Sequence, residues 1–394
     1  MRVLLTTQPA YGHFFPMLPL AVALRSAGHD VAVATSATFC PIVVQHGFTT
    51  FPVGLDWIET DFGTLPADKL PPPDTSLEEF FATVFVQLTG SHMLPDLLAL
   101  ARQWNPDLIV RGTTEFSGAV VAEMLGLPHA AVLVGAAPSV FTPELMRLVA
   151  VQYNALRRQI GLAEDPDIST LHTETVLAFA PPGLNDLEVP LFSSNIVWLK
   201  ADAAEDRPEM PALAWIQALG HNGRRVVYAT LGTVFNRVPD PFFQSVLDGL
   251  SGQALDVVVT VGPNGDPEAF GVLPPNARVE RYVPQTLILE RCDVVVFHGG
   301  SGTMLGALES GVPVVLVPFA ADQPVNARSC EVRGFGRVLL PEALSPEAVR
   351  EAVLDVLDDP AYRREAMSVR DEMRALPGSL EAVAILERLA TRDP

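Results

Sequence analysis

The segment from Val294 to Asn326 holds the residues whose types and spacing best suit chemistry. A short β-branched run, 294–297, predicts a buried strand, and the motif His298-Gly299-Gly300-Ser301-Gly302-Thr303 follows it directly. Three glycines in four positions permit a tight turn with amides close to a ligand, and the run 304–310 predicts a helix. Unpaired N–H groups and the positive end of a helix dipole favour anions, so the turn predicts a phosphate site. The alternative interpretation of a glycine pattern alone is a tight connection that binds nothing.

Two series of strands and helices are expected to position such a site. Short β-rich runs at 1–6, 31–34, 48–53, 106–110 and 130–134 alternate with helical patterns, and a second series begins at residue 225. The acidic, proline-bearing stretch 194–211 predicts the linker between them. We therefore expect an α/β protein of two Rossmann-like, doubly wound domains that face each other across a cleft. The expected boundaries are 1–206 with the linker, 207–376, and a terminal segment 377–394 that packs back on the first domain.

The composition limits the classes of partner. A formal charge of -20 argues against nucleic acid, because binding a polyanion requires a basic surface. We find no apolar run of the ~18 residues that a membrane span needs, and no signal peptide at the N-terminus. Three cysteines, an odd number without metal-ligand spacing, predict reduced thiols in a cytoplasmic protein. The one D-x-D pattern, Asp165-Pro166-Asp167, is interpreted as a solvated loop and not as a metal site.

Three motifs in order resemble one family. The segment Gly12-His13-Phe14-Phe15-Pro16, the segment Tyr282-Val283-Pro284-Gln285 and the block 298–323 resemble the inverting GT-B glycosyltransferases of small molecules, a group that includes UDP-glucuronosyl- and glucosyltransferases. The similarity covers essentially the whole chain and is greatest to the actinobacterial branch that attaches deoxysugars to antibiotics. It implies an acceptor-binding first domain, a second domain that binds a nucleotide sugar, and no requirement for metal.

The resemblance implies that His13 is the catalytic base. An acceptor hydroxyl must lose a proton as it attacks the sugar, and an imidazole titrates near neutral pH. Relatives support the base with an acid at the position of Gly112, and this chain lacks it. Glu115, three residues on, is the candidate replacement. The alternatives are that the base works unaided and that Glu115 only stabilises a helix start.

The resemblance assigns the nucleotide sugar to the second domain. The residues implied are the following: Gly232 and Thr233 over the phosphates, Val283 at the base, His298, Gly300, Ser301, Gly302 and Thr303 at the diphosphate, and Asp322 and Gln323 at the sugar. Relatives that use UDP-glucose carry a glutamate at the position of Gly306, where it bonds the ribose hydroxyls. Since a ribose hydroxyl left unpaired in a buried site costs about 1 to 3 kcal/mol, glycine favours dTDP over UDP.

The acceptor is the least constrained partner. A hydrophobic natural product would suit an apolar pocket lined by Phe14, Phe62, Phe80, Phe81, Phe85, Met93, Phe141 and Met146, although aromatic residues at helical spacing are more often core. A nucleotide-sugar epimerase or hydrolase of the same fold and a non-catalytic acceptor-binding homologue are the alternative functions. The sugar, the aglycone, the linkage, an auxiliary protein and a homodimer stay open.

Overall fold

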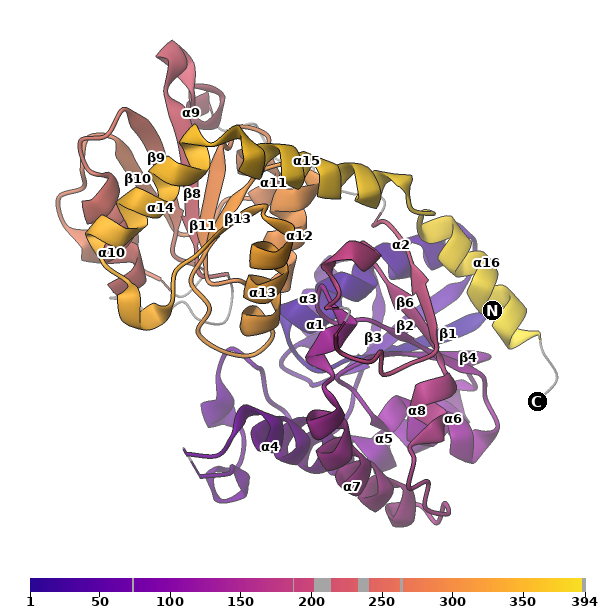
Figure 1. Cartoon of the computed structure of the whole chain (residues 1–394). Helices are drawn as coiled ribbons and strands as arrows, with labels where there is room; N and C mark the ends of the chain where they lie inside the picture. The colour runs from indigo at the N-terminus through magenta and orange to yellow at the C-terminus, as the bar shows by residue number, and fades with distance from the viewer. Residues whose placement is uncertain (73, 187, 202–213, 233–240, 263–264, 392–394) are drawn as a thin grey trace. The chain divides into compact units, whose positions relative to one another are not determined.

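A seven-stranded parallel sheet organises the first part of the chain (Figure 1). The computed structural model describes residues 1–391 except 73, 187, 202–213, 233–240 and 263–264. The strand order is β3-β2-β1-β4-β5-β6-β7, and every pairing in it is parallel. The strands are β1 Arg2–Thr6, β2 Asp30–Thr35, β3 Thr49–Pro52, β4 Leu108–Gly112, β5 His129–Val132, β6 Thr175–Ala178 and β7 Asn195–Trp198.

Helices cover both faces of this sheet, because each strand is apolar on its two sides. They are α1 Tyr11–Phe14, α2 Leu18–Ser26, α3 Cys40–Gln45, α4 Leu77–Phe81, α5 Thr89–Trp104, α6 Ser117–Leu125, α7 Pro143–Gln159, α8 Ser169–Thr173 and α16 Ser379–Ala390. Ser76 caps α4 by accepting a hydrogen bond from the Glu79 amide at 3.2 Å, as the capping-box spacing predicts. A π-helical segment, η4 Ala82–Leu88, joins α4 to α5.

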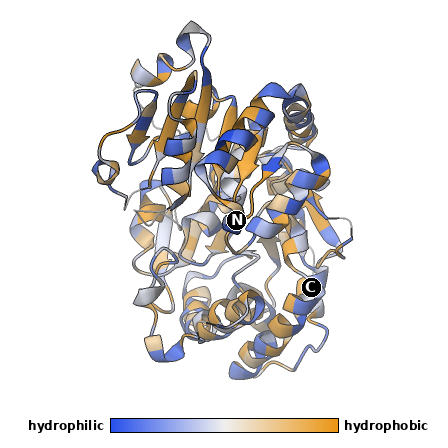
Figure 2. Cartoon of the chain, turned by 60° about the vertical axis from the view of Figure 1, so that its left-hand side comes forward, coloured by the Kyte–Doolittle hydropathy of each residue, from blue (hydrophilic) through white to orange (hydrophobic). Residues whose placement is uncertain are grey.

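A six-stranded parallel sheet organises the second part, with the order β10-β9-β8-β11-β12-β13. Its strands are β8 Arg225–Thr230, β9 Leu255–Thr260, β10 Ala277–Glu280, β11 Val294–Phe297, β12 Val314–Leu316 and β13 Gly336–Val338. Its helices are α9 Ala214–Gln217, α10 Pro241–Leu250, α11 Gln285–Leu289, α12 Ser301–Glu309, α13 Gln323–Arg333, α14 Pro346–Asp358 and α15 Pro360–Ala375. In Figure 2 the strands of the sheets are mostly hydrophobic, whereas the helices alternate hydrophobic and hydrophilic residues. The prediction of two doubly wound α/β domains is confirmed.

The chain divides into two compact units that are not contiguous in sequence. The first comprises Met1–Ala180, Leu187–Ala204 and Leu376–Pro394, and the second comprises Pro181–Asp186 and Glu205–Ala375. The short piece of the second unit is held by α13, where Ser329 donates its hydroxyl to the Leu184 carbonyl at 2.6 Å. The helix α16 packs on α2, and the Lys200 amide donates to the Pro377 carbonyl at 2.9 Å.

Two expectations about elements are wrong. The sequence analysis missed β6 and β7, and it began the linker at residue 194, inside which β7 pairs with β6. Both strands have only four residues, and β7 lies at the sheet edge with half-buried side chains, so neither has a strong apolar signature. The remainder of the expected linker, 202–211, lies outside the described residues. The helix α12 begins at Ser301, three residues earlier than expected, so the glycine motif itself forms the helix N-terminus.

Candidate active site

Each sheet reverses its strand order at one point, and the predicted histidines lie there. In the first sheet the reversal falls between β1 and β4, and in the second between β8 and β11. Ligands of open α/β sheets bind beyond the carboxyl ends of the strands at such a reversal. His13 lies on the first helix after β1, and His298 directly follows β11. The topology therefore places each candidate residue where its own domain is built to bind a ligand.

The His13 ring is held from three sides. Its Nδ1 lies 3.0 Å from the Thr114 hydroxyl, and Thr114 follows β4, the neighbour of β1 in the sheet. Its Nε2 lies 3.5 Å from Oε1 of Glu59, and the two side chains are only 12% and 16% exposed. The Phe85 ring packs against the imidazole with centroids 5.7 Å apart. The ring is thus oriented and mostly withdrawn from water, as a general base requires.

Glu115 does not contact His13, contrary to the role suggested for it from sequence. The carboxylate is fully buried, accepts a hydrogen bond from Thr6 Oγ1 at 2.5 Å, and accepts others from the Ser117 and Gly118 amides. Burial raises the pKa of this carboxyl, and the hydrogen bond from Thr6 opposes the rise. The acid stabilises the N-terminus of α6, which was the alternative interpretation.

A loop after β3 supplies the acid near His13. The Glu59 amide donates to the Pro9 carbonyl at 3.1 Å, which ties the loop to the segment that carries His13. The Ser36 hydroxyl donates to the Trp57 carbonyl at 2.7 Å. The sequence of the stretch 54–74 predicts a long loop, and loops of this length are often functional. Nothing in the spacing of Glu59 or Thr114 relative to His13 could have identified them, because the fold alone brings them together.

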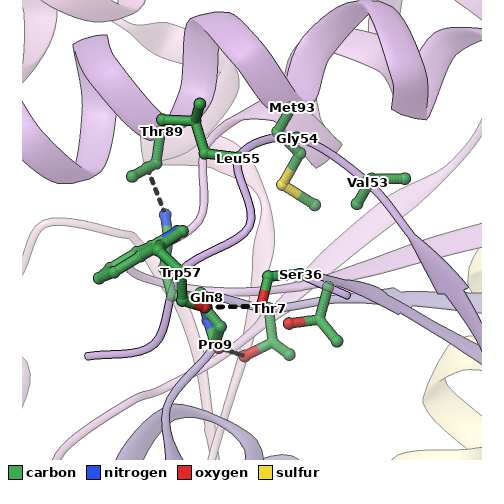
Figure 3. A pocket seen from close by; sticks show the side chains of 11 residues that line it. Thr7, Gln8, Pro9, Ser36, Val53, Gly54, Leu55, Trp57, Thr89 and Met93 are labelled. Carbon is green, nitrogen blue, oxygen red and sulfur yellow. Dashed lines mark hydrogen bonds between the residues drawn. The ribbon is translucent and has the colours of Figure 1, made fainter. Parts of the chain in front are cut away.

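The Gln8 side chain links the segment of Thr114 to the segment of Phe85, and both segments contact the His13 imidazole. Its amide nitrogen lies 3.2 Å from the Thr114 carbonyl, 3.2 Å from the Thr89 hydroxyl and 3.3 Å from the Phe85 carbonyl. Figure 3 shows Gln8 among the residues around a cavity of about 10 Å³, with its bond to Thr89 dashed. Phe85 belongs to the π-helical segment, and such segments are often found at functional sites.

The acceptor-pocket candidates are largely core residues. Phe14, Phe85, Met93, Phe141 and Met146 are buried in the hydrophobic clusters of the first unit, and Phe80 and Phe81 pack against them. The side chain of Phe62 lies outside the described residues. These residues therefore pack in the core, which was the alternative interpretation of aromatic residues at helical spacing.

In the second unit, two glycines make room for the His298 ring. A Cβ at Gly300 would lie 2.5 Å from its Nε2, and one at Gly232 would lie 2.8 Å from its Cε1. Gly232 also has φ +68°, which favours glycine. His298 is 7% exposed, and burial lowers its pKa to about 4, while a backbone hydrogen bond with Thr230 opposes the shift. At neutral pH His298 is therefore a neutral imidazole with a single N–H, for which the backbone of Thr230 is a partner.

A hydrogen-bond network fixes the N-terminus of α12. The Ser301 hydroxyl donates to Asp322 Oδ2 at 2.5 Å. The side-chain amide of Asn326 donates to the Gly299 carbonyl at 2.8 Å and to Ser301 Oγ at 2.9 Å. The network therefore joins Asp322 to the glycine turn, and Asn326 is a participant that the sequence analysis did not assign. Gly302 has open space beside it, and Thr303 is buried.

Gln323 also supports the loop before α13. Its side-chain oxygen accepts hydrogen bonds from the Phe319 amide at 2.7 Å and the Ala320 amide at 3.0 Å, and the residue is 1% exposed. Ala321, between these groups, has φ +57°, an uncommon conformation for a residue with a side chain. The loop that carries Asp322 and Gln323 is thus held in a defined and locally strained shape.

The remaining donor-site candidates flank α11 and β8. Val283 is buried just before α11, and Gly306 of α12 faces that helix, because a Cβ there would lie 3.3 Å from Leu289 Cδ1. The Gln285 amide nitrogen is 3.9 Å from the same Cβ position. Thr233 lies outside the described residues.

Comparisons with known proteins agree with this architecture. The models of the Erythromycin biosynthesis protein CIII-like N-terminal and C-terminal domains match residues 22–180 and 244–389. The chain is 28% identical to 10-deoxymethynolide desosaminyltransferase of Streptomyces venezuelae, over 100% of this chain and 98% of that protein.

Solved structures give the same result. The glycosyltransferase VinC in complex with dTDP superposes with a TM-score of 0.81 at 26% identity, covering 100% of both chains. The spinosyn rhamnosyltransferase SpnG in complex with spinosyn aglycone gives 0.82 at 26% identity, covering 98% of this chain and 100% of that one. The two family models together span most of the chain: the first covers β2 to β6, and the second covers β9 to β13. The chain therefore belongs to the Erythromycin biosynthesis protein CIII-like family, and it is a glycosyltransferase of the natural-product type.

Proposed function

We propose that this enzyme transfers a deoxysugar from its dTDP derivative to a hydroxyl group of a hydrophobic natural product. The transfer inverts the anomeric carbon, needs no metal ion, and uses His13 as general base. The observation that carries the proposal is the pair of histidine sites, each at the strand-order reversal of its own sheet. The names of the similar proteins support it: one is a desosaminyltransferase, and two structures contain dTDP or an aglycone.

The first unit supplies the base for a single displacement. The acceptor O–H bond breaks and its proton moves to the imidazole of His13, while the oxygen forms a bond to the anomeric carbon. The bond from that carbon to the diphosphate breaks, and the nucleotide leaves with the electron pair. Because the attack comes from the face opposite the leaving group, the configuration inverts. Thr114, bonded to Nδ1, keeps the ring in one orientation.

The second unit stabilises the leaving nucleotide. Negative charge grows on the diphosphate as the bond breaks, and the amides and dipole at the start of α12 are suited to receive it. The neutral His298 lies against Gly232 and Gly300 beside this turn, and Ser301 is held nearby by Asp322. These groups perform the charge stabilisation that a metal ion performs in other transferases. Gly306 supports dTDP over UDP, because the acceptor for a second ribose hydroxyl is absent.

We place the reaction in the cytoplasm, as the three free cysteines favour. The helical run Leu77–Trp104 is long and apolar enough by composition to cross a membrane, contrary to the sequence analysis. However, 56% of its apolar 18-residue window is buried inside the structure, which is typical of a core helix.

Calorimetric titration with dTDP and with UDP, in buffer containing EDTA, tests the donor assignment. We expect dTDP to bind about 5- to 150-fold more tightly than UDP, since one unpaired ribose hydroxyl costs about 1 to 3 kcal/mol. Gly300→Ala should weaken dTDP binding by at least about tenfold, because its Cβ would displace the His298 ring. Glu351→Ala, on an exposed position of α14, is the matched control and should bind as the parent does. Binding of neither nucleotide, or binding only when magnesium replaces EDTA, would contradict the proposal.

A further inference from the structure

We propose that Glu59 is the carboxylate partner of the catalytic base, replacing the acid that this chain lacks after β4. The inference rests on the proposed role of His13. The Oε1 atom of Glu59 lies 3.5 Å from His13 Nε2, on the side of the ring opposite Thr114. Among the residues that the structure describes, Glu59 is the acid within 4 Å of a nitrogen of this ring.

The usual position of the acid is a tightly packed glycine in this fold. A Cβ at Gly112 would lie 3.3 Å from Val134 Cγ2, 3.7 Å from Met17 Sδ and 3.9 Å from Thr7 Oγ1. Any side chain there would therefore require Val134 to shift by a few tenths of an ångström. Glu115, the next acid along the chain, is bonded to Thr6 and to the α6 amides. The negative charge near the base therefore comes from another part of the fold.

The loop after β3 is built to deliver this charge. Trp57 is buried in an apolar cluster with Leu65 and Phe85, which anchors the loop two residues before Glu59. The Asp56 carboxylate accepts a hydrogen bond from the Thr38 amide at 2.6 Å, and the Glu59 amide bonds to Pro9. An isolated antiparallel bridge between Ile58 and Asp61 closes the turn around Glu59. These contacts fix the backbone of Glu59 beside the segment that carries His13.

The position of Glu59 suits charge stabilisation in the transition state. The acceptor hydroxyl donates its one hydrogen to His13 Nε2, and Glu59 Oε1 lies 3.5 Å from the same nitrogen. As the O–H bond breaks, the proton moves to Nε2 and the ring becomes an imidazolium. The negative charge of the Glu59 carboxylate stabilises that positive charge across a short, largely desolvated distance. Atoms and charges balance without a further reactant.

Glu59→Gln tests the role, because it keeps the size and removes the charge. We expect kcat to fall about 10- to 100-fold while the affinity for dTDP stays unchanged. KM for the acceptor should stay close to that of the parent, so that the loss falls on kcat. Glu59→Asp, which keeps the charge, should retain more activity than Glu59→Gln. Asp68→Asn is the matched control, since it removes an exposed acid from the same loop.

The variant His13→Ala separates this inference from the proposed function. If His13→Ala keeps turnover within about threefold of the parent, the base assignment fails, and the role of Glu59 fails with it. If His13→Ala loses at least about 100-fold while Glu59→Gln keeps the kcat of the parent, only the role of Glu59 is overturned. An equal loss of kcat in Glu59→Asp and Glu59→Gln would also overturn it. Combining His13→Ala with Glu59→Gln should add no further loss, because the two residues act as a unit.

Discussion

Two histidines serve this enzyme in opposite electrostatic settings. His13 has a carboxylate beside one nitrogen and a hydroxyl beside the other. His298 lies in a buried space left by two glycines, and burial lowers its pKa to about 4. In the proposed mechanism the same type of side chain is thus a base in one unit and a neutral imidazole in the other.

The burial of His298 predicts a loss of stability in mild acid. Its pKa is lower in the folded protein, about 4, than in the unfolded chain, about 6.5, so the unfolded chain binds more protons between these values. The folded state therefore loses about 3 kcal/mol as the pH falls from 6.5 to 4. Denaturant titrations of the parent and of His298→Asn should show that their difference in unfolding free energy shrinks by about this amount over that interval.

The control for this experiment is His221→Asn, which changes an exposed histidine of the same unit. The difference in unfolding free energy between His221→Asn and the parent should stay constant as the pH falls from about 6.5 to 4. If the difference in unfolding free energy between His298→Asn and the parent also stays constant, His298 is not a neutral, buried imidazole in the folded protein.

Some residues of the candidate site were proposed from the sequence and others were not. His13 was proposed because its motif resembles a known family, and the motif beginning at His298 because glycines follow a strand there and the same resemblance covers it. Glu59, Thr114 and Asn326 contribute through contacts between segments far apart in the chain. A single sequence does not encode which distant residues meet, and Glu115 was chosen instead because it was the nearest acid along the chain.

The start of α6 depends on a buried acid. Three donors converge on Glu115, namely the Thr6 hydroxyl and the amides of Ser117 and Gly118. Replacing it with alanine leaves these donors unpaired in a site closed to water. We expect Glu115→Ala to lower the unfolding free energy by about 1 to 3 kcal/mol, while kcat of the folded enzyme stays within about threefold. Thermal unfolding and initial-rate assays measure the two effects separately.

A surface acid provides the comparison for Glu115. Glu144 forms an exposed ion pair with Arg147 on α7, so Glu144→Ala should change the unfolding free energy by less than about 1 kcal/mol. A 100-fold loss of kcat in Glu115→Ala with unchanged stability would return Glu115 to the catalytic role that the sequence suggested.

Long, well-buried helices and strands could be predicted from the sequence, whereas short or half-buried ones could not. The long alternation of apolar strands and helices was sufficient to predict two doubly wound domains. The missed strands β6 and β7 have four residues each, and the sequence of β7, Asn-Ile-Val-Trp, has a half-buried pattern that is common in loops. The continuous run from α4 to α5 was predicted in part, but its π-helical turn has no sequence signature that we recognise.

A substitution in the last helix, α16, allows the stability of the first unit to be changed separately from that of the second. Leu386 of α16 is completely buried in the cluster that includes Leu20 and Leu24 of α2. Leu386→Ala should therefore destabilise the first unit by about 2 to 5 kcal/mol. Calorimetric unfolding should show one transition at lower temperature in this variant, and saturating dTDP should raise the other transition, because ligand stabilises the unit that binds it.

Leu380→Ala is the matched control, because Leu380 lies on the same helix and is 70% exposed. It should leave both transitions unchanged. If dTDP raised the transition that Leu386→Ala lowers, the nucleotide site would not be confined to the second unit.

The non-contiguous first unit also has a consequence during synthesis. The strands and helices up to β7 leave the ribosome early, but the helix that covers α2 is the last one made. At about 5 to 20 residues per second, translating the intervening segment 205–375 takes roughly 10 to 30 s. Throughout that interval the nascent first unit exposes the apolar surface that α16 later covers. The first unit is thus begun first and completed only after the second unit has been made.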